Sequence, residues 1–184
     1  MVEIRKIVFA GGPGTGKSET IRALGRQGWH CLHEISRQII LEAQTEGISQ
    51  LFLKDPLLFS QKLLKGRIQQ YRTAEKLSGE VCFFDRGIPE ISAYMEFQNE
   101  AVPDRFIEAN LEHRYDQVFI FPIWDKIYTS DNERYETLGE AKKIDLFIRK
   151  SYKNLGYNLV EVPHAGVEAR IDFILNHINY AFSK

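Results

Sequence analysis

Short apolar runs alternate with longer amphipathic segments along the chain. The first run, residues 4–10, ends at a glycine-rich turn, which is typical of a buried strand. Residues 81–84 and 117–121 form two unbroken apolar runs, as the central strands of a parallel sheet do. With weaker runs at residues 30–32 and 158–162, the pattern predicts five strands.

The segments between these runs carry apolar residues at helical spacing. Residues 17–27 and 36–46 are predicted helices, and Gly47 is a natural end for the second. Asp55-Pro56 provides an N-cap followed by proline at the first helical position, which predicts a long helix to about residue 77. A last helix is predicted over residues 167–182. Strands that alternate with helices indicate a parallel sheet with helices on both faces.

The composition is that of a globular protein without a general charge field. Of the 184 residues, 43% are hydrophobic and 27% are charged, with 24 basic against 25 acidic side chains. A nucleic acid or an anionic membrane surface is therefore not an expected partner, and any anion must bind at a local site. The chain shows neither a signal peptide nor an apolar run long enough for a membrane span, so the cytoplasm is the expected location.

The metal-binding and redox side chains show no ligand pattern. Cys31 and Cys82 lie far apart in apolar stretches and match neither a disulfide nor a metal spacing. We expect both thiols to be reduced and buried. The histidines form no ligand-spaced cluster, so no zinc site is expected.

A phosphate-binding motif lies between the first strand and the first helix. The run Gly11-Gly12-Pro13-Gly14-Thr15-Gly16-Lys17-Ser18 satisfies G-x-x-x-x-G-K-[ST]. Its glycines allow the backbone to approach an anion, and backbone N–H groups converge there with a helix N-terminus. Lys17 is expected to reach the β- and γ-phosphates, and the Ser18 hydroxyl is expected to ligate Mg²⁺. The alternative interpretation is a glycine-rich turn that only caps the helix.

The motif makes the expected fold and ligand more specific. The ligand is Mg-ATP or a close relative, and the Glu19 backbone N–H can still serve the α-phosphate although many P-loops carry a hydroxyl residue there. We expect one domain over residues 1–184 with the three-layer α/β fold of P-loop NTPases. Its five-stranded parallel sheet is expected in the order 2-3-1-4-5, with helices on both faces and a lid at about residues 124–143.

A second acidic group separates the subclasses of P-loop proteins. Asp85 ends the third predicted strand, where a Mg-nucleotide site needs a carboxylate. Arg86 follows it, at the position where a hydrolytic motor would carry a water-activating Glu, and the chain contains no Asn-Lys-x-Asp guanine motif. The pair suits phosphoryl transfer, because Asp85 can orient Mg²⁺ water or accept a hydroxyl proton while Arg86 offsets developing charge.

At this pair the chain resembles the P-loop small-molecule kinases. Its nearest likeness is to the AAA-type ATP-binding family related to the ribosylnicotinamide kinase domain of bacterial NAD regulators. The resemblance runs nearly end to end and implies the fold and the nucleotide more firmly than the substrate. It rests on the P-loop, Glu34-Ile35-Ser36-Arg37, Asp85-Arg86-Gly87, Asp131-Asn132-Glu133-Arg134-Tyr135 and Val162-Pro163.

The acceptor is expected to bind beside the second strand. Glu34 and Arg37 follow that strand, at the edge where ligands collect in open α/β sheets. Related nucleoside kinases use a Glu there, so Glu34 competes with Asp85 for the role of base, and Glu34, Arg37 and Arg86 are expected to contact the acceptor. The alternative is that Glu34 and Arg37 are a solvated acidic and a solvated basic residue at a helix start.

Two further segments are assigned by the resemblance. Arg134, in the lid, matches the family's Asp-x-x-Arg-Tyr pattern and is expected to reach the γ-phosphate. Residues 162–166 resemble the loop whose backbone reads the adenine edge, while Trp124 is expected to be a packing residue. The alternatives to Arg134 are Lys126, Lys142, Lys143 and Arg149.

Three functions are compatible with these patterns. The favoured one is an ATP-dependent kinase that acts on a nucleoside, a nucleotide or a related metabolite. A nucleotide-binding switch that acts through a protein or lipid partner is the second, and a slow NTP hydrolase is the third. The acceptor and the oligomeric state stay open, with a homodimer through the long helix as one option.

Overall fold

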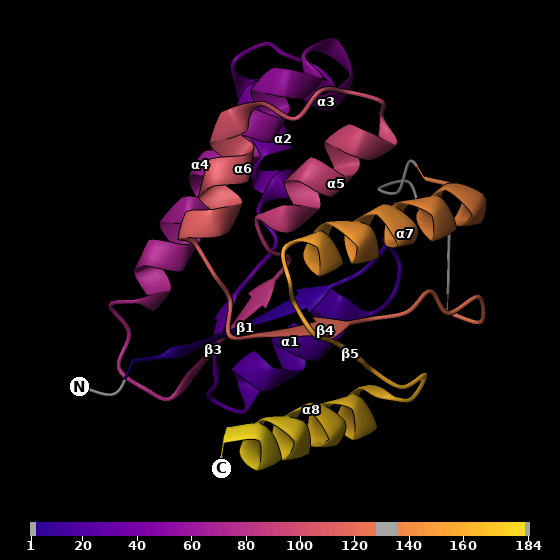
Figure 1. Ribbon diagram of the computed structural model, residues 1–184. Helices are drawn as coiled ribbons and strands as arrows, with labels where there is room; N and C mark the ends of the chain where they lie inside the picture. The colour runs from indigo at the N-terminus through magenta and orange to yellow at the C-terminus, as the bar shows by residue number, and fades with distance from the viewer. Residues whose placement is uncertain (1–2, 128–135, 183–184) are drawn as a thin grey trace.

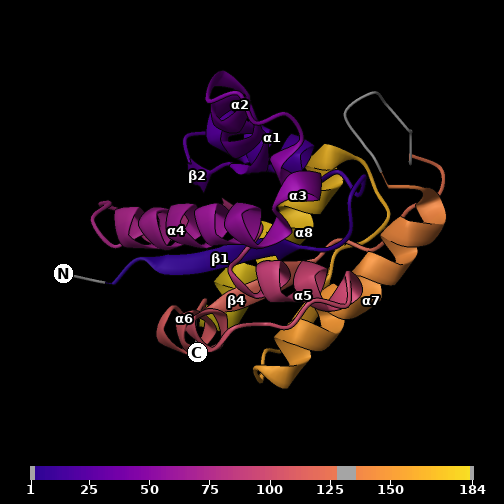
Figure 2. The ribbon, with the colours of Figure 1, turned by 90° about the horizontal axis from the view of Figure 1, so that it is seen from above.

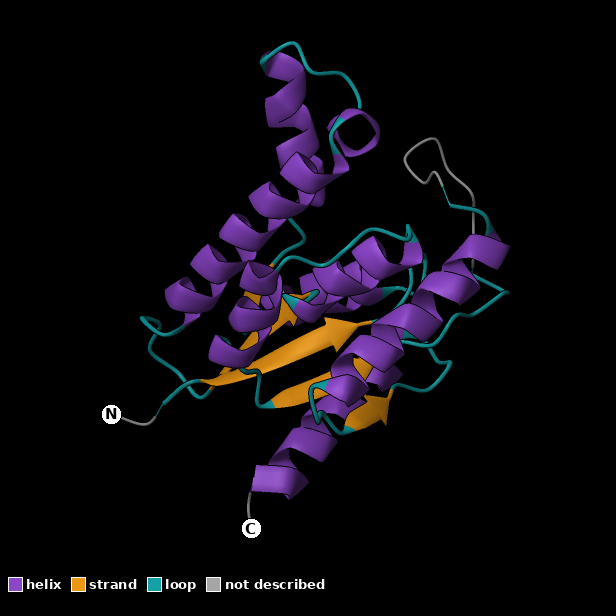
Figure 3. Cartoon of the chain, turned by 45° about the horizontal axis from the view of Figure 1, so that its top comes forward, coloured by secondary structure: helices purple, strands orange, loops and turns teal. Residues whose placement is uncertain are grey.

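The protein is described by a computed structural model that covers residues 3–127 and 136–182. Its sheet has five strands, all parallel, in the order β2-β3-β1-β4-β5, which confirms the predicted order. Figure 3 shows these strands pointing in one direction. The strands are β1 (Arg5–Ala10), β2 (His30–Leu32), β3 (Val81–Asp85), β4 (Gln117–Ile120) and β5 (Leu159–Glu161).

Helices cover both faces of the sheet, as the sequence predicts. Successive strand residues point to opposite faces, so Phe9 packs with α1 and α8 on one side while Val8 packs with α4, α5 and α7 on the other. Figure 1 shows α1 and α8 beneath the sheet, and Figure 2 shows α4, α5 and α7 side by side above it. The helices are α1 (Lys17–Arg26), α2 (Ser36–Thr45), α3 (Leu51–Lys54), α4 (Pro56–Ala74), α5 (Pro89–Phe97), α6 (Asp104–Glu112), α7 (Leu138–Asn154) and α8 (Val167–Phe182).

A third group of helices stands away from the sheet. The helices α2 and α3 and the first half of α4 project upward in Figure 1, and they enclose an apolar cluster that includes Ile39, Leu51 and Leu63. The Asp55 carboxylate accepts a hydrogen bond from the Leu58 N–H, which is the predicted N-cap of α4. None of the described helices is both long and apolar enough to cross a membrane.

The strand register brings the predicted site residues to one edge. Phe9 of β1 pairs with Asp85 of β3, and Leu32 of β2 pairs with Phe84. The carboxyl ends of three neighbouring strands therefore lie together, and they carry the start of the glycine-rich loop, Asp85 and the segment that leads to Glu34.

Candidate functional site

The glycine-rich loop adopts a conformation that requires glycine at several positions. Gly11, Gly14 and Gly16 have φ values of +126°, +74° and +86°, which side chains rarely tolerate. A Cβ atom at Gly11 would collide with the Phe121 carbonyl oxygen. The loop thus sits directly on the end of β4, and α1 begins at Lys17 immediately after it.

Lys17 lies at the centre of this loop. Its ammonium donates hydrogen bonds to the carbonyls of Gly11 (2.9 Å) and Gly12 (2.7 Å) and to the Thr15 hydroxyl (2.9 Å). Burial lowers its pKa to about 8, and the nearby Arg86 cation adds to this effect. The oxygens that accept these hydrogen bonds carry no net charge. A bound anion would therefore supply the negative charge that balances the Lys17 ammonium.

Ser18 and Asp85, the two predicted metal ligands, are in direct contact. The Ser18 hydroxyl donates to Asp85 Oδ2 at 2.6 Å, and Asp85 is buried at the end of β3. Hydroxyl and carboxylate oxygens are ligands that Mg²⁺ prefers, with water and phosphate oxygens completing its shell. This donor pair therefore fits the expected metal.

Arg86 is held between two carboxylates. Its φ of +76° is unusual for a residue with a side chain. Its Nε lies 2.7 Å from Glu34 Oε2, and its Nη1 lies 2.5 Å from Glu90 Oε2 and donates to the Gly11 carbonyl at 3.3 Å. The guanidinium thus connects the end of β3 to the glycine-rich loop, to the segment before α2 and to α5.

The pKa of the Glu34 carboxyl is set by opposing effects. Burial favours the neutral acid, but the guanidinium groups of Arg67 and Arg86 and the N–H groups of Ile35 and Ser36 outweigh it and lower the pKa. Arg67 lies 3.5 Å away, and the two N–H groups donate at 2.9 and 3.0 Å. Glu34 is therefore ionised at neutral pH.

Glu90 and Arg67 belong to this cluster, although the sequence patterns did not single them out. Glu90 is fully buried in α5, its pKa is raised by that burial, and it accepts a 3.3 Å hydrogen bond from the Gly87 N–H. Arg67 of α4 donates to the Gly87 carbonyl at 2.5 Å. The signal for Glu90 was an acidic residue four positions after Arg86 in an otherwise apolar segment.

A cavity of about 830 Å³ extends from the glycine-rich loop into the space between α2, α3, α4 and α5. Glu34, Arg37, Asp85 and Arg86 all line it, so the structure brings these predicted residues together. Its far wall is mainly apolar and aromatic, and it is formed by Ile40, Phe52, Leu53, Phe59, Leu63, Ile91, Tyr94 and Phe97.

The predicted lid is described only in part. Arg134 and the segment 131–135 lie outside the described residues, while residues 138–143 form the first turns of α7. Among the alternatives, Lys142 pairs with Asp125 at 2.9 Å, and Arg149 pairs with Asp145 and Glu161 at 2.7 and 2.8 Å.

Trp124, which was predicted to be a packing residue, makes its packing contacts outside the hydrophobic core. It is half-buried, and its ring stacks on the exposed His164 with centroids 5.2 Å apart and planes 8° from parallel. The contact joins the loop after β4 to the loop after β5, which contains the segment 162–166 that resembles an adenine-reading loop.

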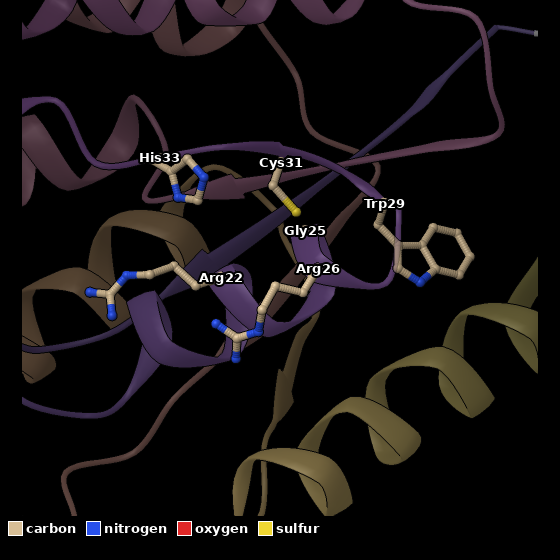
Figure 4. A pocket seen from close by; sticks show the side chains of 6 residues that line it. All are labelled: Arg22, Gly25, Arg26, Trp29, Cys31 and His33. Atoms are coloured by element: carbon tan, nitrogen blue, oxygen red, sulfur yellow. The ribbon is translucent and has the colours of Figure 1, made fainter.

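A second cavity, of about 410 Å³, lies between α1 and β2 (Figure 4). Figure 4 shows Arg22 and Arg26 extending from α1 on one side, with Cys31 and His33 on the other. Burial raises the pKa of the Cys31 thiol to about 11, so it is protonated at neutral pH and a poor nucleophile. Cys31 is half-buried and Cys82 is buried, and both are free, as predicted.

Comparisons with known proteins place these features in a wider group. A family model described as an AAA domain matches residues 6–170. Deoxyadenosine kinase from M. mycoides is 18% identical, with a TM-score of 0.69 over 95% of this chain and 99% of that chain. Thymidylate kinase from Candida albicans is 15% identical, with a TM-score of 0.66 over 97% of this chain and 92% of that chain.

A third solved structure is larger than this chain. The NadR protein in complex with NR is 14% identical, with a TM-score of 0.73 over 98% of this chain, which spans only 50% of that chain. No curated protein matches the sequence. At these identities the likeness to solved structures shows the fold and leaves the substrate open.

Proposed function

The chain belongs to the AAA-domain family and has the fold of nucleoside and nucleotide kinases, and from this premise we propose that it is an ATP-dependent kinase for a small acceptor. The observation that carries the proposal is the contact of Ser18 with Asp85 at the mouth of an acceptor-sized cavity. A nucleotide switch needs no such cavity beside its phosphate loop, whereas a phosphotransferase needs a second substrate there.

The nucleotide side of the proposed site is built from the glycine-rich loop. Lys17 would exchange its loop carbonyls for the β- and γ-phosphate oxygens of ATP, because an ammonium bonds more strongly to charged acceptors. Ser18 and Asp85 would hold Mg²⁺, which supplies neutralisation of charge on the phosphates. The Glu19 N–H, in the first turn of α1, is available for the α-phosphate.

Proton transfer from the acceptor is assigned to Glu34. Asp85 already accepts a hydrogen bond from the Ser18 hydroxyl. Glu34, in contrast, lines the cavity next to two arginines and is ionised. In the step, the acceptor oxygen bonds to the γ-phosphorus while the bond from that phosphorus to the β–γ bridging oxygen breaks, and ADP leaves. The hydroxyl proton passes to Glu34, and Arg86 offsets charge on the transferred group.

The cavity favours an acceptor with a flat aromatic portion and a hydroxyl or phosphate end. Phe52, Phe59, Tyr94 and Phe97 offer ring surfaces for such a group, while Glu34 and Arg37 lie toward its polar end. Nucleosides and nucleoside monophosphates combine both features. The structures that share this fold include a deoxyadenosine kinase and a thymidylate kinase, which supports this class.

The test is ADP formation from Mg-ATP by the purified protein, alone and with pooled nucleosides, nucleoside monophosphates or pyridine ribosides. ADP that appears only with one pool would establish a kinase and its acceptor class. ADP formation independent of all pools would indicate a hydrolase, and ATP binding without ADP would favour the switch. The variant Lys17→Ala, prepared identically, controls for contaminating kinases.

A further inference from the structure

Arg170 is a buried cation with no carboxylate partner in the part of the chain that the structure describes. It lies in the first turn of α8 and is only 2% exposed. Within residues 3–127 and 136–182, no carboxylate pairs with it and its Nη2 has no hydrogen-bond partner. Burial accordingly lowers its pKa. Burying a charge without a counter-charge costs free energy, so its position calls for an explanation.

The Arg170 guanidinium connects three loops at the carboxyl edge of the sheet. Its Nη1 donates to the Thr15 carbonyl of the glycine-rich loop at 2.9 Å, and its Nε donates to the Pro163 carbonyl after β5 at 3.2 Å. Its Cζ lies 5.5 and 5.3 Å from the ring centroids of Phe121 and Trp124, after β4. Cation–π contacts and two carbonyls stabilise the cation only in part.

Gly16 is what allows the guanidinium so close to the loop. A Cβ atom there would lie 2.6 Å from Arg170 Nη1, and the φ of Gly16 is +86°. The backbone conformation favours glycine at this position, and the absence of a Cβ atom leaves room for the Arg170 guanidinium. The charge therefore lies directly against the loop that would hold the phosphates.

We propose that Arg170 is a positioning residue for nucleotide binding. It fixes the phosphate loop to the loops after β4 and β5, and the bound polyphosphate balances its buried charge. The inference rests on the proposed nucleotide binding but not on phosphoryl transfer. Attraction between Arg170 and the phosphates acts through the poorly polarisable interior, where charges are screened less than in water. The unbalanced cation thus lowers the stability of the free protein and favours the complex.

The test compares Arg170→Met, which removes the charge at similar length, with Arg170→Lys, which retains it. Melting temperature without nucleotide and the dissociation constant for Mg-ATP are measured for both and for wild type. Arg72→Met is the matched control, because Arg72 is an exposed residue of α4 and lines neither cavity.

For Arg170→Met we expect Mg-ATP to bind roughly ten- to a hundredfold more weakly, the usual effect of losing hydrogen bonds from a charged group. The nucleotide-free variant should melt no more than about 4 °C below wild type, because an uncompensated charge is removed along with the contacts. Arg170→Lys should recover part of the lost affinity, and Arg72→Met should match wild type.

A purely structural role gives the opposite pattern. Arg170→Met would then fail to fold or melt far below wild type, or it would bind Mg-ATP as tightly as wild type does. Either result overturns the proposal, as does a lysine variant no better than methionine. If wild type itself binds no Mg-ATP, both this inference and the proposed function fail; if it binds but transfers no phosphate, only the kinase proposal fails.

Discussion

The two carboxylates that hold Arg86 have different environments. Glu34 is partly exposed to the cavity and its pKa is lowered by two arginines, whereas Glu90 is fully buried and its pKa is raised by burial. Both residues line the cavity, but only Glu34 has exposed surface there with which to meet an acceptor. This difference separates the proposed base, Glu34, from a residue that acts by fixing the direction of Arg86.

Replacement of Glu90 by glutamine tests this division. Glutamine keeps the size and the acceptor for the Gly87 N–H but removes the charge that faces Arg86. We expect kcat to fall roughly tenfold to a hundredfold, as the loss of a charged hydrogen bond implies, while the KM for ATP changes little. Glu112→Gln, at an exposed position of α6, is the control. An unchanged kcat would contradict the assigned role of Glu90.

Lys17 predicts a pH dependence of nucleotide binding. Burial lowers its pKa to about 8, and a bound polyphosphate favours the charged ammonium. The affinity for Mg-ATP should therefore be at its maximum below pH 8. It should weaken as the pH rises through 8, by up to about tenfold per pH unit. Titrations with Mg-ATP between about pH 6.5 and 9.5 measure this. The variant Lys17→Arg stays charged, so its affinity for Mg-ATP should not fall in this pH range. If the affinity of wild type does not change with pH, the assigned role of Lys17 is contradicted.

The residues found from the sequence were those that local motifs specify. The glycine-rich loop, Asp85 and Glu34 could be placed because each follows a recognisable strand. Arg170 could not, because what makes it notable is the burial of its charge. That burial depends on packing between helices and strands far apart in the sequence.

At the scale of elements, the strands were easier to predict than some helices. All five strands lie where apolar runs predict them, but α3, α5, α6 and α7 were not predicted. Residues Pro89, Ile91, Ala93 and Met95 are all buried in α5 because the helix packs between α4, α6 and α7. A helix buried on most sides has no alternation of apolar and polar faces to reveal it. The helix α3 has only four residues.

The junction of β3 and α5 gives a stability prediction. A Cβ atom at Gly87 would lie 2.5 Å from the Tyr152 hydroxyl, 2.9 Å from the Tyr115 ring and 3.0 Å from Val8. These neighbours are buried and cannot easily move, so Gly87→Ala should destabilise the fold by about 1–3 kcal/mol. Thermal unfolding should show a loss of roughly 2–4 °C per kcal/mol.

Gly139 provides the matched control for this substitution. It lies in the first turn of α7, where an added Cβ meets only the Thr137 Oγ1 at an ordinary 3.9 Å. Alanine favours helix over glycine, so Gly139→Ala should stabilise the protein by up to about 1 kcal/mol. Equal effects of the two substitutions would show that the close packing around Gly87 does not govern stability there.

For the whole molecule, the sheet order determines where chemistry can occur. Because β1 lies beside β3, and β3 beside β2, the glycine-rich loop, Asp85 and Glu34 meet at one edge. The helices α2 to α5 then add an aromatic-walled cavity to that edge. The sequence could predict that the strand ends meet, but it could not predict the cavity. The side chains that line the cavity come from several helices, and only the packed structure shows which side of each helix is turned toward it.

The central claim is that the γ-phosphoryl group of ATP is transferred to an acceptor in this cavity. The most direct measurement uses ATP labelled with ¹⁸O in its γ-phosphoryl group, with mass spectrometry of the acceptor pools after incubation with wild type and with Glu34→Gln. We predict a labelled phosphorylated product from one pool with wild type and far less of it with Glu34→Gln. Label found only in inorganic phosphate, or retained entirely in ATP with every pool, would contradict the account.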